Sequence, residues 1–347
     1  MTMQLAPPSP AAASNREDFA ALSRHVRAGG LLKHRRAYYA VKIGTALCAL
    51  VALAILAVIL GDSWWNLGVA AGLSFVLTQL GFIGHDAGHR QICRRRRNND
   101  AIGVVVANLL TGFSFGWWLA KHNRHHANTN RPERDPDLAP GALVYLPEQV
   151  SERGGFGRWF ARSQALMLVP LLFLEALHLH VASVRALSRR RDLAGLVESG
   201  LLALHGVVFF GLPFLILSPI RAVAFIGVTQ ALFGFYLGIS FLTNHVGMPT
   251  VSGGDDLGFL RRQVLTSRNL SGRRLTGFVF GGLDTQIEHH LFPTMPRPNL
   301  RRSREVVRPF CVERRIAYAE RSPWRAYREV LRHLRAVGVG AELPAIG

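Results

Sequence analysis

The stretch WWNLGVAAGLSFVLTQLGFIGHDAGH, residues 64–89, decides what kind of protein this chain is. Residues 64–84 are uncharged and mostly apolar, and a helix of this length crosses the roughly 30 Å hydrocarbon core of a bilayer. The polar sequence HDAGH follows at once and contains His85 and His89. The stretch therefore predicts a membrane-spanning helix that delivers two imidazoles to one membrane surface.

Three more stretches are uncharged and long enough to cross a bilayer, namely residues 43–60, 199–220 and 222–244. Residues 61–63 separate the first of them from the stretch above, and Arg221 alone separates the other two. Connections this short predict two helical hairpins. The composition agrees, since 49% of the residues are hydrophobic and only 18% are charged, against roughly 25% in an ordinary soluble domain. The sequence thus predicts an all-α integral membrane protein with four transmembrane helices.

Two further apolar stretches, residues 101–120 and 163–184, compete for the same role. If only one of them crossed the membrane, the second hairpin would be inverted. If both crossed it, the histidines of residues 122–126 would face the side opposite to His85. We therefore expect both stretches to lie in the membrane interface, or to enter the membrane and return on the same side.

Basic residues are concentrated on one side of the predicted spans. Of the 41 Lys and Arg residues, 40 lie in the two terminal segments or in the long segment between the hairpins, and only Arg221 lies in a short turn. The positive-inside rule places both termini and the long middle segment in the cytosol, which in a bacterium means a plasma-membrane protein with a cytosolic active site. The formal net charge of +19 in an apolar chain favours anionic lipid over nucleic acid as the partner.

The chain divides into three parts by composition. Residues 1–34 are predicted to be a disordered cytosolic arm, residues 35–335 the membrane domain, and residues 336–347 a C-terminal tail. Residues 297–335 hold 12 Arg against four Glu among apolar residues at helical spacing, which predicts interfacial amphipathic helices and a cytosolic helical cap. The three cysteines form no CxxC pair, so neither a thiolate metal site nor a disulfide framework is predicted.

Eight of the 14 histidines are grouped in a way that predicts metal binding. Besides HDAGH, the chain contains HNRHH at residues 122–126 and QIEHH at residues 286–290, and His245 directly follows the fourth predicted span. Residues i, i+3 and i+4 share one face of a helix, so each group offers its imidazoles to one point. The candidate metal ligands are His85, His89, His122, His125, His126, His245, His289 and His290.

Eight imidazoles suggest two metal ions, because an ion such as zinc takes about four ligands. Imidazole suits Zn, Cu, Fe and Ni, so the ligand type leaves the metal open. Few carboxylates accompany the imidazoles, which favours redox chemistry on a lipid over hydrolysis at a two-metal site. Asp86 and Glu288 are expected to face outward and to accept hydrogen bonds from ligand N–H groups. Asn244 and Gln286 are further candidates for a ligand or for its support.

The three boxes HxxxH, HxxHH and QxxHH resemble those of the membrane-bound fatty acid desaturases. HNRHHANTN, residues 122–130, and GGLDTQIEHHLFPTMPRPNL, residues 281–300, are especially similar to members of that family. The resemblance covers roughly residues 35–330. It implies that the eight histidines bind two iron ions, which activate O2 and remove two hydrogens from a fatty acyl chain carried by coenzyme A, a carrier protein or a lipid.

The glutamine of the third box is typical of front-end desaturases, and of many bacterial acyl desaturases, within this family. A front-end desaturase inserts a double bond between an existing one and the carboxyl end. Gln286 offers a carbonyl and an amide but no imidazole. It could therefore support a ligand or a bound water, coordinate a metal directly, or do neither.

Front-end desaturases often carry a fused haem domain with a His-Pro-Gly-Gly motif, which this chain lacks. Electrons are therefore expected from a separate donor, such as a ferredoxin-like carrier with its reductase, for which the basic face offers a docking surface. The alternative enzyme is a hydroxylase or ketolase that acts on a lipid or carotenoid with the same two irons. A metal carrier or a non-catalytic lipid-binding protein is disfavoured, because a carrier needs polar residues along its spans and the predicted spans are uncharged.

Overall fold

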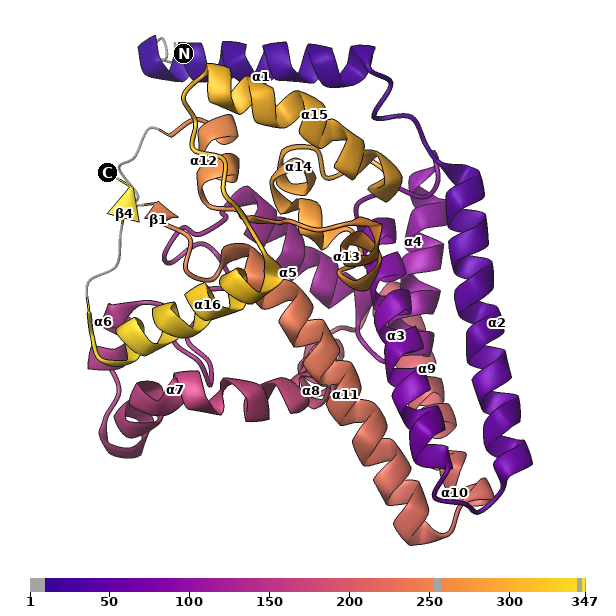
Figure 1. Cartoon of the computed structure of the whole chain (residues 1–347). Coiled ribbons are helices and arrows are strands. Elements are labelled where there is room, and N and C mark those ends of the chain that lie inside the picture. Colours follow the sequence, from indigo (N-terminus) through magenta and orange to yellow (C-terminus); the bar gives the residue numbers. More distant parts are fainter. Residues whose placement is uncertain (1–9, 252–256, 342–344, 347) are drawn as a thin grey trace. The chain divides into compact units, whose positions relative to one another are not determined.

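The computed structural model describes residues 10–251, 257–341 and 345–346, and almost all of its regular structure is helical (Figure 1). The predicted all-α fold is therefore confirmed. The chain forms two compact units that each draw on distant parts of the sequence. Unit 1 comprises residues 1–33, 124–165 and 243–347, and unit 2 comprises residues 34–123 and 166–242.

Four helices are long and apolar enough to cross a membrane, as predicted, which makes the chain a multi-pass membrane protein. The first two form a hairpin in unit 2, and their packing builds most of the core of that unit. The third helix is interrupted by a π-helical turn, η2, before it ends. The four are α2 (Arg36–Leu60), α3 (Asn66–Gly88), α9 with η2 and α10 (Leu193–His205, Gly206–Gly211 and Pro213–Ile216), and α11 (Pro219–His245).

The helix ends differ from the predicted span ends in two ways that affect the histidines. Helix α3 continues to Gly88, so His85 lies in its last turn, and His245 is the last residue of α11. The predicted turn at Arg221 is also wrong, because α11 already begins at Pro219. Proline is favoured in the first turn of a helix, and Arg221 forms an ion pair with Asp62 of the first hairpin.

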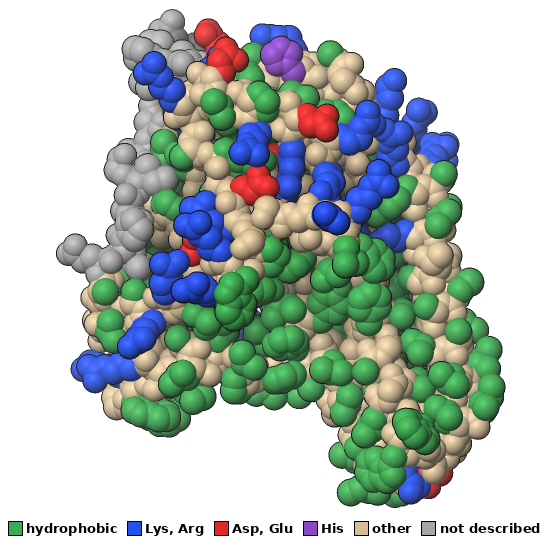
Figure 2. Space-filling view, viewed as in Figure 1, with side chains coloured by type: hydrophobic (Ala, Val, Ile, Leu, Met, Phe, Trp, Pro, Cys, Tyr) green, Lys and Arg blue, Asp and Glu red, His purple; other side chains and the backbone are tan. Residues whose placement is uncertain are grey.

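The surface of α2 is apolar along most of its length, as Figure 2 shows. Val58 and Ile59 are 61% and 74% exposed, whereas Leu77 and Leu80 of α3 are buried in the core of unit 2. Large apolar side chains exposed in this number are costly in water and natural in lipid. This pattern supports the assignment of α2 as a span at the lipid-facing side of its hairpin.

The two competing apolar stretches are both sharply bent. Helix α4 (Arg96–Val104) and the π-helix η1 (Val105–Thr111) meet α5 (Phe115–Ala127) at 112°. Helix α7 (Gly155–Phe173) meets α8 (Glu175–Leu187) at 72°. Neither stretch forms one straight crossing. Each is either a broken span or a segment that enters the membrane and returns, so the expectation that both return or lie in the interface stays a prediction.

Unit 1 contains helices of 3 to 19 residues and two pairs of two-residue parallel strands, β1 with β4 and β2 with β3. Its helices α14 and α12 pack on α1 and α15 around a core of buried apolar side chains. The elements of unit 1 are α1 (Pro10–Ala28), α6 (Pro147–Ser151), β1 (Thr250–Val251), α12 (Phe259–Leu265), β2 (Asn269–Leu270), α13 (Arg274–Val279), η3 (Leu283–Thr285), α14 (Gln286–Leu291), α15 (Arg297–Glu313), β3 (Glu320–Arg321), α16 (Pro323–Gly338) and β4 (Ala345–Ile346).

The N-terminal arm is not disordered over the part that the structure describes. Helix α1 buries Leu22 and Val26 in the core of unit 1, and Arg314, directly after α15, forms an ion pair with Asp18 at 2.8 Å. The apolar residues of the arm recur at helical spacing, so they form a face that can pack. Residues 1–9 of the predicted arm lie outside the described residues.

The predicted amphipathic helices of residues 297–335 are present as α15 and α16. Helix α16 buries Val330, Leu334 and Val337, and it continues to Gly338, beyond the predicted domain boundary at residue 335. Figure 2 shows basic side chains spread over the surface that these helices occupy.

Candidate metal centre

Helix α5 carries the HNRHH box across the boundary between the two units. His122 belongs to unit 2, whereas His125 and His126 belong to unit 1. All three lie at i, i+3 and i+4 on one helix, so they project from the same face. Each unit collects its own group of histidines around the part of α5 that it contains.

In unit 2, His122 meets the two histidines of HDAGH at the end of α3. The Nε2 atoms of His122 and His89 are 2.9 Å apart, and the ring of His85 lies 4.7 Å from that of His89 and 5.1 Å from that of His122. One nitrogen of each ring lies within 4.8 Å of the others. Trp118 stacks on His122 with a ring separation of 4.6 Å. Three imidazoles therefore converge in unit 2, where they could share one cation.

A short chain of hydrogen bonds supports His85. The Oδ1 atom of Asp86 lies 3.4 Å from His85 Nδ1, and the hydroxyl of Tyr39 donates to Asp86 Oδ2 at 2.9 Å. Both Asp86 and Tyr39 are buried. Asp86 therefore contacts the candidate ligand His85, although the length of this contact makes it a weak hydrogen bond.

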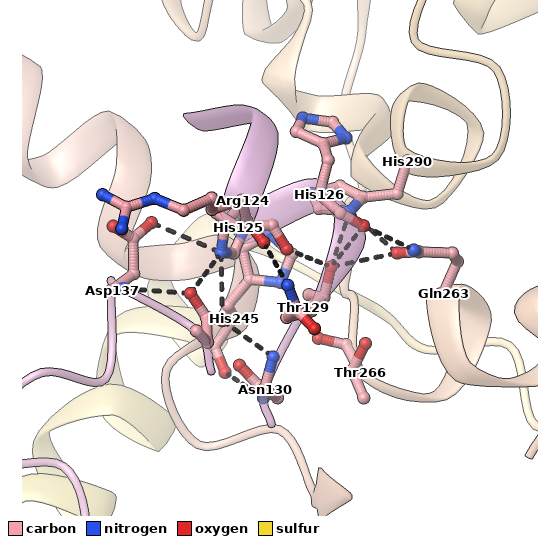
Figure 3. A network of polar contacts seen from close by, with 12 residues as sticks. Arg124, His125, His126, Thr129, Asn130, Asp137, His245, Gln263, Thr266 and His290 are labelled. Atoms are coloured by element: carbon pink, nitrogen blue, oxygen red, sulfur yellow. Dashed lines mark hydrogen bonds and ion pairs between the residues drawn. The ribbon is translucent and has the colours of Figure 1, made fainter. Parts of the chain in front are cut away.

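In unit 1, His125, His245 and His290 form a second convergent group, drawn in Figure 3. They come from α5, the end of α11 and α14. Their ring centroids are 4.6 to 5.2 Å apart, and one nitrogen of each lies within 4.8 Å of the others. Three helices that are remote in sequence thus bring one imidazole each to a common point.

The hydrogen bonds at Nδ1 decide what these three rings can do. His125 Nδ1 lies 2.9 Å from a carboxylate oxygen of Asp135, His245 Nδ1 lies 3.0 Å from the carbonyl of Thr266, and His290 Nδ1 lies 2.9 Å from Gln263 Oε1. A neutral imidazole that donates from Nδ1 keeps a lone pair on Nε2. Among the described residues, the buried His290 Nε2 has no hydrogen-bond partner. The group therefore presents converging lone pairs, which a metal cation would satisfy.

The protonation state of His290 fits the same role. Burial, with the neighbouring imidazoles adding to it, holds the pKa of His290 well below its usual value. The ring is therefore neutral at physiological pH, and neutral imidazole is the form that binds metals.

The remaining two predicted ligands, His126 and His289, lie beside this group in unit 1. Their Nε2 atoms are 3.2 Å apart, and the ring of His126 stacks on that of His290 at 4.1 Å. The eight predicted histidines are thus distributed as three in unit 2 and five in unit 1.

Gln286 touches the group in unit 1. Its Nε2 lies 2.9 Å from His245 Nε2, and its Oε1 accepts a hydrogen bond of 3.2 Å from Asn244 Nδ2. The amide therefore contacts a candidate ligand at the nitrogen that faces the common point. This contact favours a supporting role, while direct coordination would require the amide to turn its oxygen inward.

The role of Gln286 can be tested with two substitutions. Gln286→Ala should retain most of the metal while activity falls about 10–100-fold, the usual cost of removing a group that orients a ligand. Gln286→His places an imidazole where the amide meets His245 and should impair turnover by adding a ligand or displacing a water. Metal content by mass spectrometry and product formation are measured together. Wild-type metal content and activity in both variants would mean that Gln286 neither binds the metal nor supports a ligand.

The prediction for Glu288 is wrong in its choice of partner. Its carboxylate accepts hydrogen bonds from Tyr318 at 2.6 Å and from Asn269 at 2.8 Å, and no imidazole bonds to it among the described residues. Burial raises the pKa of Glu288, against the opposing effect of these donors. Glu288 points away from the histidines because it lies on the opposite face of α14, where it ties this helix to β2 and to the segment after α15.

Two supporting residues were missing from the sequence interpretation. Asp135 follows His125 closely in HNRHHANTNRPERDPD, and a carboxylate so near a histidine box is a usable signal. Gln263 lies on α12, where its amide also donates to the carbonyl of His126 at 2.8 Å. No sequence pattern connects Gln263 to the histidines, because only the packing of unit 1 brings α12 to α14.

A family model described as fatty acid desaturase matches residues 62–322 of this chain. The chain is 30% identical to the acyl-lipid (9-3)-desaturase of Physcomitrium patens, over 90% of this chain and 61% of that protein. It is 30% identical to the delta(6)-fatty-acid desaturase fat-3 of Caenorhabditis elegans, over 87% of this chain and 70% of that protein. It is also 28% identical to the delta 8-(E)-sphingolipid desaturase of Komagataella phaffii, over 78% of this chain and 54% of that protein.

Proposed function

We propose, since this chain belongs to the fatty acid desaturase family, that it inserts a double bond into a fatty acyl chain with O2 at a pair of metal ions held by its histidines. The observation that carries this proposal is the convergence of three imidazoles in each unit, with the Nδ1 atoms of His125, His245 and His290 all engaged by acceptors. In such an arrangement the Nε2 atoms are the ones that can bind a cation.

The ligand sets follow from the two groups. In unit 2, His85, His89 and His122 would hold one ion. In unit 1, His125, His245 and His290 would hold the other, with His126 and His289 beside them. These imidazoles suit iron, and the family implies iron, which when bound supplies the redox chemistry that activates O2.

The residues of the chain prepare the site rather than react. Asp135, Gln263 and the carbonyl of Thr266 keep the Nδ1 protons in place, so the Nε2 atoms remain available. The spanning helices provide the apolar surface that an acyl chain needs. In the overall reaction the substrate gives up two hydrogens, O2 is reduced to two molecules of water, and an external donor supplies the remaining two electrons with two protons.

The substrate class is inferred from the relatives and from the third box. The three relatives above are named for acyl-lipid, fatty-acid and sphingolipid desaturation. The box QIEHH of this chain is the glutamine version typical of front-end desaturases. We therefore infer a front-end desaturase acting on an acyl lipid, with electrons from a separate acidic carrier attracted by the basic residues of α15 and α16. Hydroxylation or ketolation on the same site gains no support from these relatives.

The experiment that tests this function is expression in a host with a simple lipid profile, supplied with iron and a ferredoxin-type donor. New double bonds located by mass spectrometry on the carboxyl side of existing ones would support the proposal. Hydroxylated or oxo products would replace desaturation by the alternative reaction. Unchanged lipids from a metal-loaded protein that receives electrons would contradict both.

The orientation proposed for the chain, with both termini and the metal site cytosolic, gives a separate prediction. In a background with the exposed Cys48 replaced by Ser, a cysteine at Ser63 should react with an impermeant maleimide in intact cells. A cysteine at the exposed Glu152 should react only after permeabilisation. Labelling of position 152 from outside would reverse the assignment of the segment between the hairpins.

A further inference from the structure

The chain turns sharply in unit 2 just before α5, the helix that carries HNRHH. This turn, at residues 111–115, is called the corner. The π-helix η1 ends at Thr111, Gly112 adopts a positive φ of 77°, and α5 begins at Phe115 with a change of direction of 112°. A break inside an apolar segment leaves backbone groups without their helical partners, and these groups need other partners in a membrane. The side chains that satisfy these backbone groups therefore show which parts of the chain are fixed at the corner.

At and just before the corner, two imidazoles donate hydrogen bonds to backbone carbonyl groups that lack their helical partners. His180 Nδ1 lies 2.7 Å from the carbonyl of Gly112, and His205 Nδ1 lies 2.9 Å from the carbonyl of Leu109. A Cβ atom at residue 112 would lie 2.4 Å from both rings, so only glycine fits there. These histidines lie outside the metal groups, and their hydrogen bonds give them a structural role at the corner.

At the end of the corner, the buried Glu198 of α9 receives the first turn of α5. Its Oε2 accepts from the hydroxyl of Ser114 at 2.7 Å and from the backbone N–H of Gly116 at 3.0 Å. The Ser114 hydroxyl in turn accepts from the N–H of Trp117 at 3.2 Å, and Arg190 pairs with Glu198 Oε1 at 2.8 Å. A carboxylate at a helix N-terminus is favourable both as a cap and against the helix dipole.

Glu198 is an acidic residue inside the third spanning helix, which begins at Leu193. The span predicted from the sequence begins only at residue 199 and therefore does not include Glu198. Charged groups within spans are costly, and those that are retained usually have a specific task. The contacts of Glu198 indicate the task, because its carboxylate oxygens accept from the start of α5, from the side-chain amide of Asn108 in η1 at 3.3 Å, and from one arginine.

The start of α5 matters because this helix acts as a lever for His122. Gly116 and His122 are separated by about 9 Å along the helix axis. A tilt of roughly 10° at the cap would shift His122 by about 1.5 Å, whereas metal–ligand distances tolerate about 0.2 Å. Trp118, one turn after the cap, stacks on His122 and transmits the position of the first turn to the ring.

We propose that Glu198, braced by Arg190, is a positioning residue that sets the direction of α5 and thereby holds His122 against His85 and His89. The proposal rests on the proposed metal centre in unit 2. It does not require that the protein desaturates a particular lipid.

The test compares Glu198→Ala with Glu175→Ala, which removes another acid that pairs with a basic group in unit 2, His178, at 3.4 Å. The full-length protein in lipid nanodiscs is loaded with iron or with zinc, and the bound metal and the hydrogen exchange of α5 are measured. Glu198→Ala should lower the metal content by about one ion per chain, with binding about 10–100-fold weaker. The amides of residues 116 and 117 should exchange about tenfold faster, as expected for a lost helix cap. Glu175→Ala should match the wild type.

Two further variants keep the proposal open to contradiction. Glu198→Gln retains an acceptor for the N–H of Gly116, and Arg190 still pairs with Asp192, so this variant should recover most of the metal. If Glu198→Ala fails to fold, Ser114→Ala should still accelerate exchange in the first turn of α5. Wild-type exchange and two bound metal ions in Glu198→Ala, or in Ser114→Ala where the former fails to fold, would overturn the proposal. Because metal and exchange are read without turnover, an inactive wild type would refute the proposed function and leave this inference intact.

Discussion

Replacing His290 by alanine should abolish acyl desaturation and remove about one metal ion per chain. The Nε2 atom of His290 is buried and, among the described residues, has no hydrogen-bond partner, so the group in unit 1 would lose one of three convergent lone pairs. Zinc or iron with only two remaining imidazoles would bind far more weakly. The measurement is metal content per chain together with double-bond formation in the expressing host.

His333→Ala is the matched control for this loss. His333 is a half-buried histidine of α16 in the same unit, and its Nε2 lies 3.2 Å from the carbonyl of Tyr145. Its removal should lower stability modestly while metal content and activity remain. If His290→Ala kept its metal and its activity, the ligand assignment in unit 1 would fail.

Asp135→Asn should lower activity about 10–100-fold and weaken metal binding in unit 1. The carboxylate lies 2.9 and 3.0 Å from His125 Nδ1, and it also accepts from the backbone N–H groups of Asn130 and Asp137. An amide lacks the charge that strengthens these bonds and can present an N–H group to a donor, which would turn the ring of His125 or change its tautomer. Titration of the protein with zinc measures the loss directly.

Asp137→Asn separates this effect from a general loss of negative charge. Asp137 lies 3.4 Å from the same nitrogen of His125, but its side chain is 44% exposed, so water screens and replaces its interaction. The Asp137→Asn variant should therefore keep nearly wild-type metal affinity. Equal losses in the two variants would mean that local charge, rather than the hold of Asp135 on His125, supports the site.

The spanning helices and the histidine boxes could be predicted because both signals are local. An apolar run long enough for a helical crossing identifies itself, and the i, i+3, i+4 spacing of HNRHH places its three imidazoles on one face whatever the rest of the chain does. The contact of Asp86 with His85 could also be predicted, since the two residues are adjacent in the sequence. Disorder of the N-terminal arm was predicted from its composition. Composition does not show that Leu22 and Val26 pack into the core of unit 1.

The sequence by itself determined that four helices are long and apolar enough to cross a membrane and that eight histidines fall in groups at helical spacing, because hydrophobic length and helical periodicity are properties of neighbouring residues. Only the tertiary structure decided which groups hold those histidines. Gln263 reaches His290, and Glu288 turns to Tyr318, through contacts that depend on how unit 1 packs. Glu198 likewise reaches Gly116 across 82 residues of chain. Such partners are set by the burial of polar groups that must each find a donor or acceptor, and that requirement is met in three dimensions and leaves no periodic trace along the chain.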